Sequence, residues 1–506
     1  MSCCIFFATS CGKQPNPSST SSGTSEPYVE PKVKLEHNIK EYINNCYYPF
    51  SSSPYQGDSN ILVVPVWFTD SNDYIIGSAK KDFILSDIND VFNKDRLDLG
   101  WYSVSSFYNQ ESLGKLNLNA IVSDWYECGK AHTYFAKSYE TTTLLAKEVS
   151  DWYFNTTKAN RKDFDADGDG YIDSIVMIYG CPNYVSLRDG TASNLWAYTS
   201  WIANKSAKSI SKPGANVFMW ASYDYMYGQE VVRQRTGSDY CYGDTRNASL
   251  DSHTYIHEFG HVLGVEDYYD YSDHRYVPAG GFSMQDNAIG GHDPYSTLVW
   301  EWSDVYMPKE SVTLTIKDFQ SSHDLILLSN HDVTSVFDEY ILLELYTPTI
   351  LNELDTKYPY ARRYDCGPTI PGIRVWHIDS RLVYLTNPTS VDPNNITTDP
   401  TTTKGKYGVY LMESNSYDGS NASILGRNYY NYNIVQLIRN NLVETYKPKE
   451  SIVNNDLFRK GYTFDMETFS QQFVKNTRLN NGKSFNWSFE VKDLSSSQAT
   501  IKLTLN

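Results

Sequence analysis

The residues that carry the most chemical information lie in one short stretch, His257–Asp267, which reads HEFGHVLGVED. Residues four apart share one face of a helix, so His257 and His261 can present two imidazole rings to one metal ion. Glu258 is placed to act as general base toward zinc-bound water rather than as a ligand. Asp267 follows a glycine that can end the helix, and we expect it to be the third ligand. The pattern predicts a catalytic zinc site with an open fourth position.

Neighbours of the motif leave two alternatives open. Glu266 is a rival third ligand, although the spacing after Gly264 favours Asp267. His253 lies one turn before His257 and could supply a further nitrogen, but a local hydrogen bond is the simpler expectation. A surface helix with stacked histidines and no metal is disfavoured, because an apolar face predicts a buried helix. That face comprises Ile256, Phe259, Val262 and Leu263.

A second motif, DADGDGYID, has the spacing of a calcium-binding loop. The carboxylates of Asp165, Asp167, Asp169 and Asp173, with the backbone carbonyl of Tyr171, form a set of oxygens that Ca²⁺ favours. The twelfth position of the loop is not a glutamate, and the next segment is typical of a strand rather than a helix, so this is not a standard EF-hand. We expect a structural calcium site, with a metal-free turn as the alternative.

Two further features depend on the zinc motif for their interpretation. In the segment Gly280–Asp286, which reads GGFSMQD, Met284 is expected to form an apolar floor beneath the metal. A methionine without such a motif nearby would be interpreted as an ordinary core residue. An oxyanion-stabilising side chain is also expected, and Tyr268, Tyr295 and His292 are candidates between which the sequence does not choose.

The composition indicates a folded protein with more acidic than basic groups. The chain has 506 residues, a formal charge of −17 and 41% hydrophobic residues, enough for two or three domains with buried cores. Its 42 tyrosines favour a β-rich protein with carved clefts. The acidic balance argues against nucleic acid as a partner, and no apolar run is long enough to span a membrane.

The pattern along the chain predicts two structural regions. Before about residue 308, the sequence indicates a buried strand, three helices and a helix-to-strand break at Gly114, in the segments 61–68, 79–93, 104–125 and 141–154. After it, strands separated by polar loops are expected at 312–316, 340–344, 373–377, 409–412 and 499–505. We therefore expect an α/β zincin-type, metzincin-like catalytic domain at 57–308, followed by a β-sandwich-like domain at 309–506.

The first residues, MSCCIFFATSC, are similar to the end of a bacterial secretion signal with a lipobox-like arrangement. Cys11 would then be the lipidated first residue, residues 1–11 the signal remnant, and residues 12–56 a flexible tether and N-terminal segment. The alternative is an ordinary N-terminal segment, since a basic region is missing before the apolar stretch. The expected location is extracellular or on the cell surface, with a lipid anchor as the only membrane attachment. Cys46 is weighed as a latency thiolate, although a buried free thiol is the simpler expectation.

Together these motifs resemble the immune inhibitor A family of secreted bacterial metallopeptidases, the M6-type metzincins. The stretch Ser106–Leu116 is similar to the family's "YY.E.S.GKL" pattern. Further segments similar to the family are 165–173, 339–344, 372–379 and 456–461. Asp267 departs from the usual metzincin histidine. The resemblance implies a zinc-dependent peptidase with structural calcium that cleaves extracellular proteins.

The expected function is therefore a zinc-dependent endopeptidase that acts on protein or peptide substrates, with Zn²⁺ and Ca²⁺ bound. One alternative is a catalytically silent surface protein that binds host or dietary glycoproteins, which the intact Glu258 disfavours. Another is a zinc hydrolase of a non-peptide substrate. The cleavage specificity and the oligomeric state are not determined by the sequence.

Overall fold

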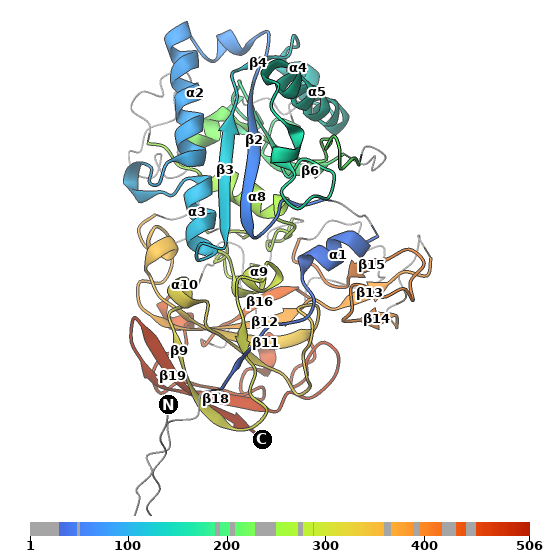
Figure 1. The fold of residues 1–506 in the computed structure, drawn as a ribbon. Helices are drawn as coiled ribbons and strands as arrows, with labels where there is room; N and C mark the ends of the chain where they lie inside the picture. The colour runs from blue at the N-terminus through green and yellow to red at the C-terminus, as the bar shows by residue number, and fades with distance from the viewer. Residues whose placement is uncertain are drawn as a thin grey trace, which may run out of the picture.

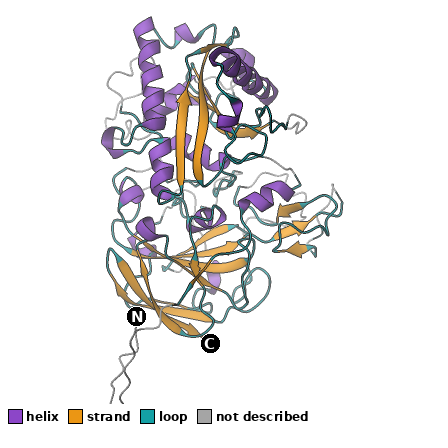
Figure 2. Cartoon of the chain, in the orientation of Figure 1, coloured by secondary structure: helices purple, strands orange, loops and turns teal. Residues whose placement is uncertain are grey.

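The computed structural model describes residues 30–47, 51–187, 193–202, 208–227, 249–271, 277–286, 288–358, 366–387, 392, 394–416, 432–441 and 452–506. Over these residues the chain is a mixed α/β protein with several sheets (Figures 1 and 2). Cys11 and the expected signal remnant lie outside the described residues. None of the helices in the described part of the chain is long and apolar enough to cross a membrane.

The first large sheet holds the strands in the upper part of Figure 1 and is mostly parallel. Its order is β3 (Leu116–Val122), β2 (Gly57–Trp67), β5 (Ile175–Tyr179), β7 (Val217–Ser222) and β6 (Tyr198–Trp201), and β4 (Tyr126–Glu127) also pairs with β2. Only β6, at the edge, runs antiparallel to its neighbour. The continuous apolar run that predicted β2 has a simple cause: successive residues such as Val63 and Val64 enter different cores on the two faces of the sheet.

Helices cover both faces of this sheet. The helices in the described part of the whole chain, of which only some cover this sheet, are α1 (Ile39–Asn45), α2 (Ser78–Asn93), α3 (Val104–Glu111), α4 (His132–Phe135), α5 (Tyr139–Thr157), α6 (Tyr184–Leu187), α8 (His253–Val262), α9 (Pro294–Val299) and α10 (Phe319–Ser322). Side chains of α2, α3 and α8 share one core with the sheet. Side chains of α5 fill the core on the other face. The expected helices at 79–93 and 141–154 are confirmed, and so is the break from helix to strand within 104–125: α3 ends at Glu111, Gly114 adopts a φ of +79°, and β3 follows.

The part of the chain after residue 300, together with one short strand near the start of the described residues, forms three sheets. A six-stranded sheet has the order β1 (Lys32–Val33), β8 (Val305–Tyr306), β10 (Leu325–Leu328), β11 (Glu339–Tyr346), β12 (Gly372–Asp379) and β16 (Val435–Ile438). An all-antiparallel four-stranded sheet has the order β17 (Thr463–Phe464), β18 (Trp487–Leu494), β19 (Gln498–Leu505) and β9 (Val312–Lys317). A small sheet has the order β14 (Ile396–Thr397), β13 (Leu382–Tyr384) and β15 (Val409–Leu411). The six-stranded and four-stranded sheets share one apolar core.

Part of the segment expected as a tether is built into the fold. Strand β1 pairs with β8, and α1 begins at a capping box in which Asn38 accepts from the Lys40 backbone and Glu41 accepts from the Asn38 backbone. The backbone N–H of Tyr47 then donates to the carbonyl of Val409 in the small sheet at 2.8 Å. Residues 32–47 therefore connect the sheets that follow residue 300.

Candidate metal centre and cleft

The helix that carries the metal motif, α8, is held in place by neighbours on several sides. The hydroxyl of Tyr108 on α3 donates to the carbonyl of Ile256 at 2.7 Å. The helix ends at Val262, and Gly264 has a φ of +100°, a left-handed backbone that turns the chain back toward the metal motif. A Cβ at Gly264 would lie 2.8 Å from Cδ1 of Ile43, so α1 packs directly on this turn.

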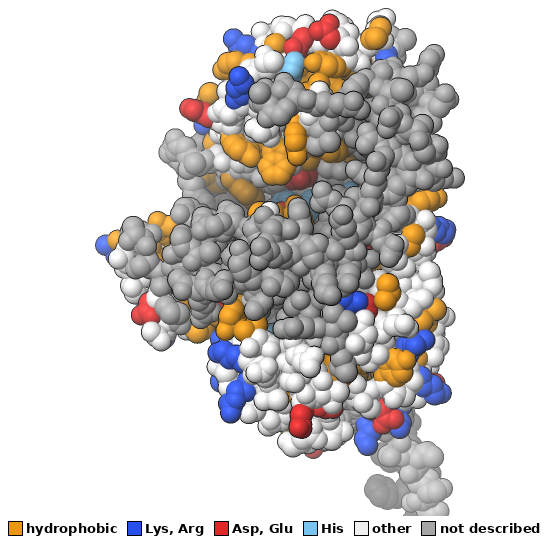
Figure 3. Space-filling model, turned by 180° about the vertical axis from the view of Figure 1, so that it is seen from behind, with side chains coloured by type: hydrophobic (Ala, Val, Ile, Leu, Met, Phe, Trp, Pro, Cys, Tyr) orange, Lys and Arg blue, Asp and Glu red, His pale blue; other side chains and the backbone are white. Residues whose placement is uncertain are grey.

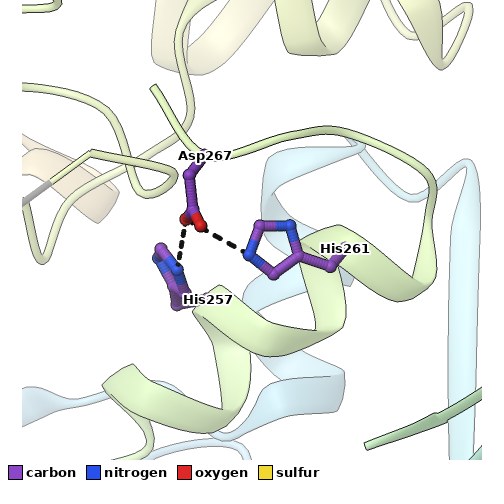
Figure 4. Close-up of side chains that lie close together, drawn as sticks. All are labelled: His257, His261 and Asp267. Atoms are coloured by element: carbon purple, nitrogen blue, oxygen red, sulfur yellow. Dashed lines mark ion pairs between the residues drawn. The ribbon is translucent and has the colours of Figure 1, made fainter. Parts of the chain in front are cut away.

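His257, His261 and Asp267 converge on one point (Figure 4). Oδ1 of Asp267 lies 2.9 Å from Nε2 of His257 and 3.2 Å from Nε2 of His261. Ligand atoms of a tetrahedral zinc ion lie about 3.3 Å apart, so these separations suit zinc. Glu266, the rival ligand, borders the same cleft but is not among the three converging side chains.

The hydrogen bonds around the two rings set up this group for a cation. Nδ1 of His257 donates to the carbonyl of Met284 at 2.7 Å, and Nδ1 of His261 donates to the carbonyl of Val265 at 2.8 Å. A neutral ring with its proton on Nδ1 has a lone pair on Nε2, so in the neutral state both lone pairs face the buried Oδ1 of Asp267. Burial lowers the pKa of His261, but the Asp267 carboxylate more than offsets this and raises the pKa to about 9, so the surroundings of the ring favour a positive charge. The donor set therefore fits zinc.

The remaining oxygen of Asp267 and the nearby His253 have other partners. The hydroxyl of Tyr271 donates to Oδ2 of Asp267, which leaves Oδ1 for the histidines. Nε2 of His253 lies 3.1 Å from the carbonyl oxygen of Ala288, and burial lowers the pKa of His253 to about 3. His253 is thus a buried neutral ring with a local hydrogen bond and is not one of the converging side chains.

Glu258 is buried and borders the cleft beside the first histidine. Oγ1 of Thr199, on the edge strand β6, lies 2.8 Å from the carbonyl oxygen of Glu258 and 3.3 Å from its Oε2. Burial raises the pKa of Glu258, and the positive charge of protonated His261 and His257 opposes that rise. A carboxylate with a raised pKa can accept a proton and later return it. The sequence carried no signal for Thr199, because strand and helix meet only through the tertiary fold.

Three buried polar side chains, those of Gln285, His292 and Glu111, lie behind α8. Of these, only His292 was a candidate from the sequence. The amide nitrogen of Gln285 lies 3.3 Å from Nδ1 of His261, and its oxygen lies 3.1 Å from Nε2 of His292. Nδ1 and the backbone N–H of His292 both meet the carboxylate of Glu111. His292 is fully buried, so the structure removes it from the candidates for contact with a substrate. Glu111 belongs to the stretch that resembled a peptidase family, and this was its only signal in the sequence.

The metal motif opens into a cleft of about 980 Å³. In Figure 3, histidine and acidic side chains are visible at the bottom of a hollow bordered by hydrophobic side chains. The walls of the cleft come from the region of the parallel sheet and from the region of the later sheets. They include Tyr42 of α1, Trp196 before β6 and Phe337 before β11. Met284, whose carbonyl holds His257, is fully buried behind the motif.

The other residues considered for roles in this cleft have defined places. Cys46 borders the cleft, but its thiol lies 3.6 Å from the carbonyl oxygen of Ile43 and is not in the converging group. Tyr268 and Tyr295 also border it, and both are nearly fully buried. The Tyr268 hydroxyl accepts from Oγ of Ser296 at 3.4 Å. The geometry therefore does not single out an oxyanion-stabilising tyrosine.

The second motif also brings carboxylates together. Oxygens of Asp165, Asp167 and Asp173 lie within 4.8 Å of one another, and Oδ1 of Asp165 is buried without a hydrogen-bond partner. Burial raises the pKa of Asp173 to about 8, as expected where the charge of several carboxylates is uncompensated. Asp169, which was also expected as a ligand, is not in this group; its Oδ1 accepts the backbone N–H of Tyr171 at 2.8 Å. Three of the expected calcium ligands thus form a group that fits a hard cation.

No family model matches this chain, and no curated protein is significantly similar to it. Function must therefore be inferred from the residues and their geometry.

Proposed function

We propose that this chain is a zinc-dependent endopeptidase that hydrolyses extracellular proteins. One observation carries the proposal: the buried Oδ1 of Asp267 lies 2.9 Å from Nε2 of His257 and 3.2 Å from Nε2 of His261, and the Nδ1 atom of each ring is bound to a backbone carbonyl. The next residue after the first ligand is a buried carboxylate at the edge of a large cleft, Glu258. Such a ligand group with an adjacent carboxylate suits the hydrolysis of an amide bond.

Zinc bound at this site would act as a Lewis acid that polarises the scissile carbonyl and makes water more acidic. Glu258 would take a proton from the attacking water molecule and transfer it to the nitrogen of the departing amine. Thr199 orients the Glu258 carboxylate from β6. The Met284 carbonyl keeps the His257 proton on Nδ1, so Nε2 stays available as a ligand.

The fold supports a finer assignment that we also propose. The parallel sheet with α8 and an antiparallel edge strand corresponds to a zincin-type, metzincin-like catalytic domain, with Met284 behind the motif. The two sheets around a common core correspond to a β-sandwich-like domain. With the sequence resemblance to the immune inhibitor A family, this favours a calcium-stabilised, exported peptidase anchored through a lipid on Cys11.

The test compares digestion of heat-denatured casein by the purified chain and by Glu258→Gln, each with zinc and calcium and with its metal content measured. We expect one zinc per chain in both proteins and at least a hundredfold slower digestion by the variant. Glu266→Gln, which alters the neighbouring acidic residue of the cleft, should retain activity. A zinc-loaded wild type that digests nothing, or a Glu258→Gln variant that digests normally, would overturn the proposal.

A further inference from the structure

Exposed aromatic side chains border the cleft. Tyr139, Tyr184 and Trp196 border the cleft and have exposed fractions of 53%, 37% and 39%. The buried ring of Tyr198 packs against two of them, with its centroid 5.0 Å from that of Tyr139 and 5.9 Å from that of Trp196. The backbone N–H of Tyr184 donates to the carbonyl of Leu195 at 2.7 Å, which places its segment beside Trp196. A cluster of exposed large apolar rings in a cleft marks a binding site rather than a random surface feature.

This cluster, Tyr139, Tyr184, Trp196 and Tyr198, is close to the proposed general base. Thr199 contacts Glu258 and is three residues after Trp196. Three residues of chain span at most about 11 Å, so the Cα of Trp196 lies no further than that from the Cα of Thr199. An extended substrate advances about 3.3 Å per residue. A substrate side chain over the aromatic cluster would therefore lie within about three residues of the bond to be cleaved.

The chemistry of the lining selects among possible occupants. The described residues that line the cleft include no lysine, arginine, asparagine or glutamine. An acidic substrate side chain would find no lysine or arginine counter-ion among them. Aromatic rings instead offer apolar area and favourable edge-to-face packing with another ring.

We infer that the aromatic cluster is a substrate subsite that accepts a large apolar side chain, preferably aromatic, within about three residues of the scissile bond. The inference rests on the proposed peptidase function and adds its substrate class. It makes Trp196 and Tyr139 specificity-determining residues, because their rings are exposed to the cleft and contribute little to the core.

The test uses internally quenched peptides in which a single Phe is moved through successive positions of an alanine–glycine background. We expect one favoured Phe position, at which kcat/KM is about tenfold above that for Ala. In Trp196→Ala and in Tyr139→Ala, kcat/KM for this Phe peptide should fall by about the same factor. Trp196→Phe should recover most of the preference. Tyr134→Ala is the matched control, since Tyr134 has an exposed fraction of 50% and does not line the cleft.

A binding measurement separates failure of the subsite from failure of the proposed function. Titration of zinc-loaded Glu258→Gln with the Phe peptide and its Ala counterpart should show tighter binding of the Phe peptide, and Trp196→Ala should remove the difference. If casein is digested but neither kinetics nor binding distinguishes Phe from Ala, the subsite is overturned while the peptidase function stands. Faster cleavage of a glycosylated peptide than of the Phe peptide would also overturn it, in favour of a sugar-binding platform.

Discussion

Glu111 on α3 and His292 before α9 form a buried pair behind the metal motif, in which the carboxylate meets both Nδ1 and the backbone N–H of the histidine. The residues are 181 positions apart in the chain. Because His292 is held by Glu111, its Nε2 can fix the amide of Gln285, and that amide contacts the ring of His261. The pair therefore restrains a proposed zinc ligand through one intervening side chain.

Replacing Gln285 by Ala should weaken zinc binding without removing any ligand. The His261 ring would lose the amide that lies against it, and loss of such outer contacts typically lowers metal affinity by ten- to a hundredfold. We expect about a tenfold weaker zinc affinity in a chelator competition. Gln436→Ala is the control, because the amide of Gln436 is also buried and donates to the Gln472 carbonyl away from the metal motif. Equal zinc affinity in the two variants would contradict the restraint.

Gly260→Ala should destabilise the protein although alanine is the better helix former. Alanine gains about 1 kcal/mol of helix propensity over glycine. However, its Cβ would lie 2.3 Å from Oε1 of Gln285 and 3.1 Å from Nε2 of His292, and His292 is locked to Glu111. Overpacking of a buried site costs about 1–3 kcal/mol, so we expect a lower free energy of unfolding in urea. The double variant Gly260→Ala, Gln285→Ala should be more stable than Gly260→Ala alone. If its loss in free energy of unfolding equals the sum of the losses in the two single variants, the steric explanation is refuted.

Calcium should raise the melting temperature through Asp165 and its neighbours. A cation that binds only the folded state at a hundred times its Kd adds about 2.7 kcal/mol, which corresponds to several degrees for a protein of this kind. Asp165→Asn and Asp173→Asn should lose most of the calcium-dependent shift in a thermal melt. Asp163→Asn, a nearby carboxylate outside the converging group, should keep it. An unchanged shift in Asp165→Asn would place the calcium elsewhere.

His323 should contribute to unfolding in acid. Its Nδ1 donates to the Trp302 carbonyl at 3.1 Å, and burial, aided by Lys115 and Lys32, lowers its pKa to about 4. Because the folded pKa lies below the unfolded value of about 6.5, its contribution is fully present above pH 6.5 and is lost as the pH falls toward 4. Asn tolerates the φ of +52° at this position, so His323→Asn should flatten the urea stability profile between these values. His37→Asn is the control, and an identical slope in both variants would exclude His323 as the titrating group.

The sequence was a good guide where local geometry decides. Two histidines four apart on an apolar-faced segment predicted α8, and the left-handed Gly264 after it was expected from glycine's freedom. The apolar run of β2 and the break at Gly114 were predicted for similar reasons. The third ligand was harder, since Asp267 and Glu266 are adjacent and only the path of the chain after Gly264 brings Asp267 onto the histidines.

By itself, then, the sequence determined the pattern of candidate ligands, the adjacent carboxylate, the acidic loop and the alternation of elements, because each depends on spacing along one helix, strand or turn. Only the tertiary structure decided what surrounds them. Glu111 and His292 behind α8, Thr199 beside Glu258 and the aromatic rings of the cleft are distant in the chain. They meet because sheets, helices and the segment before residue 48 bury their apolar faces against one another, and this packing depends on the whole chain at once.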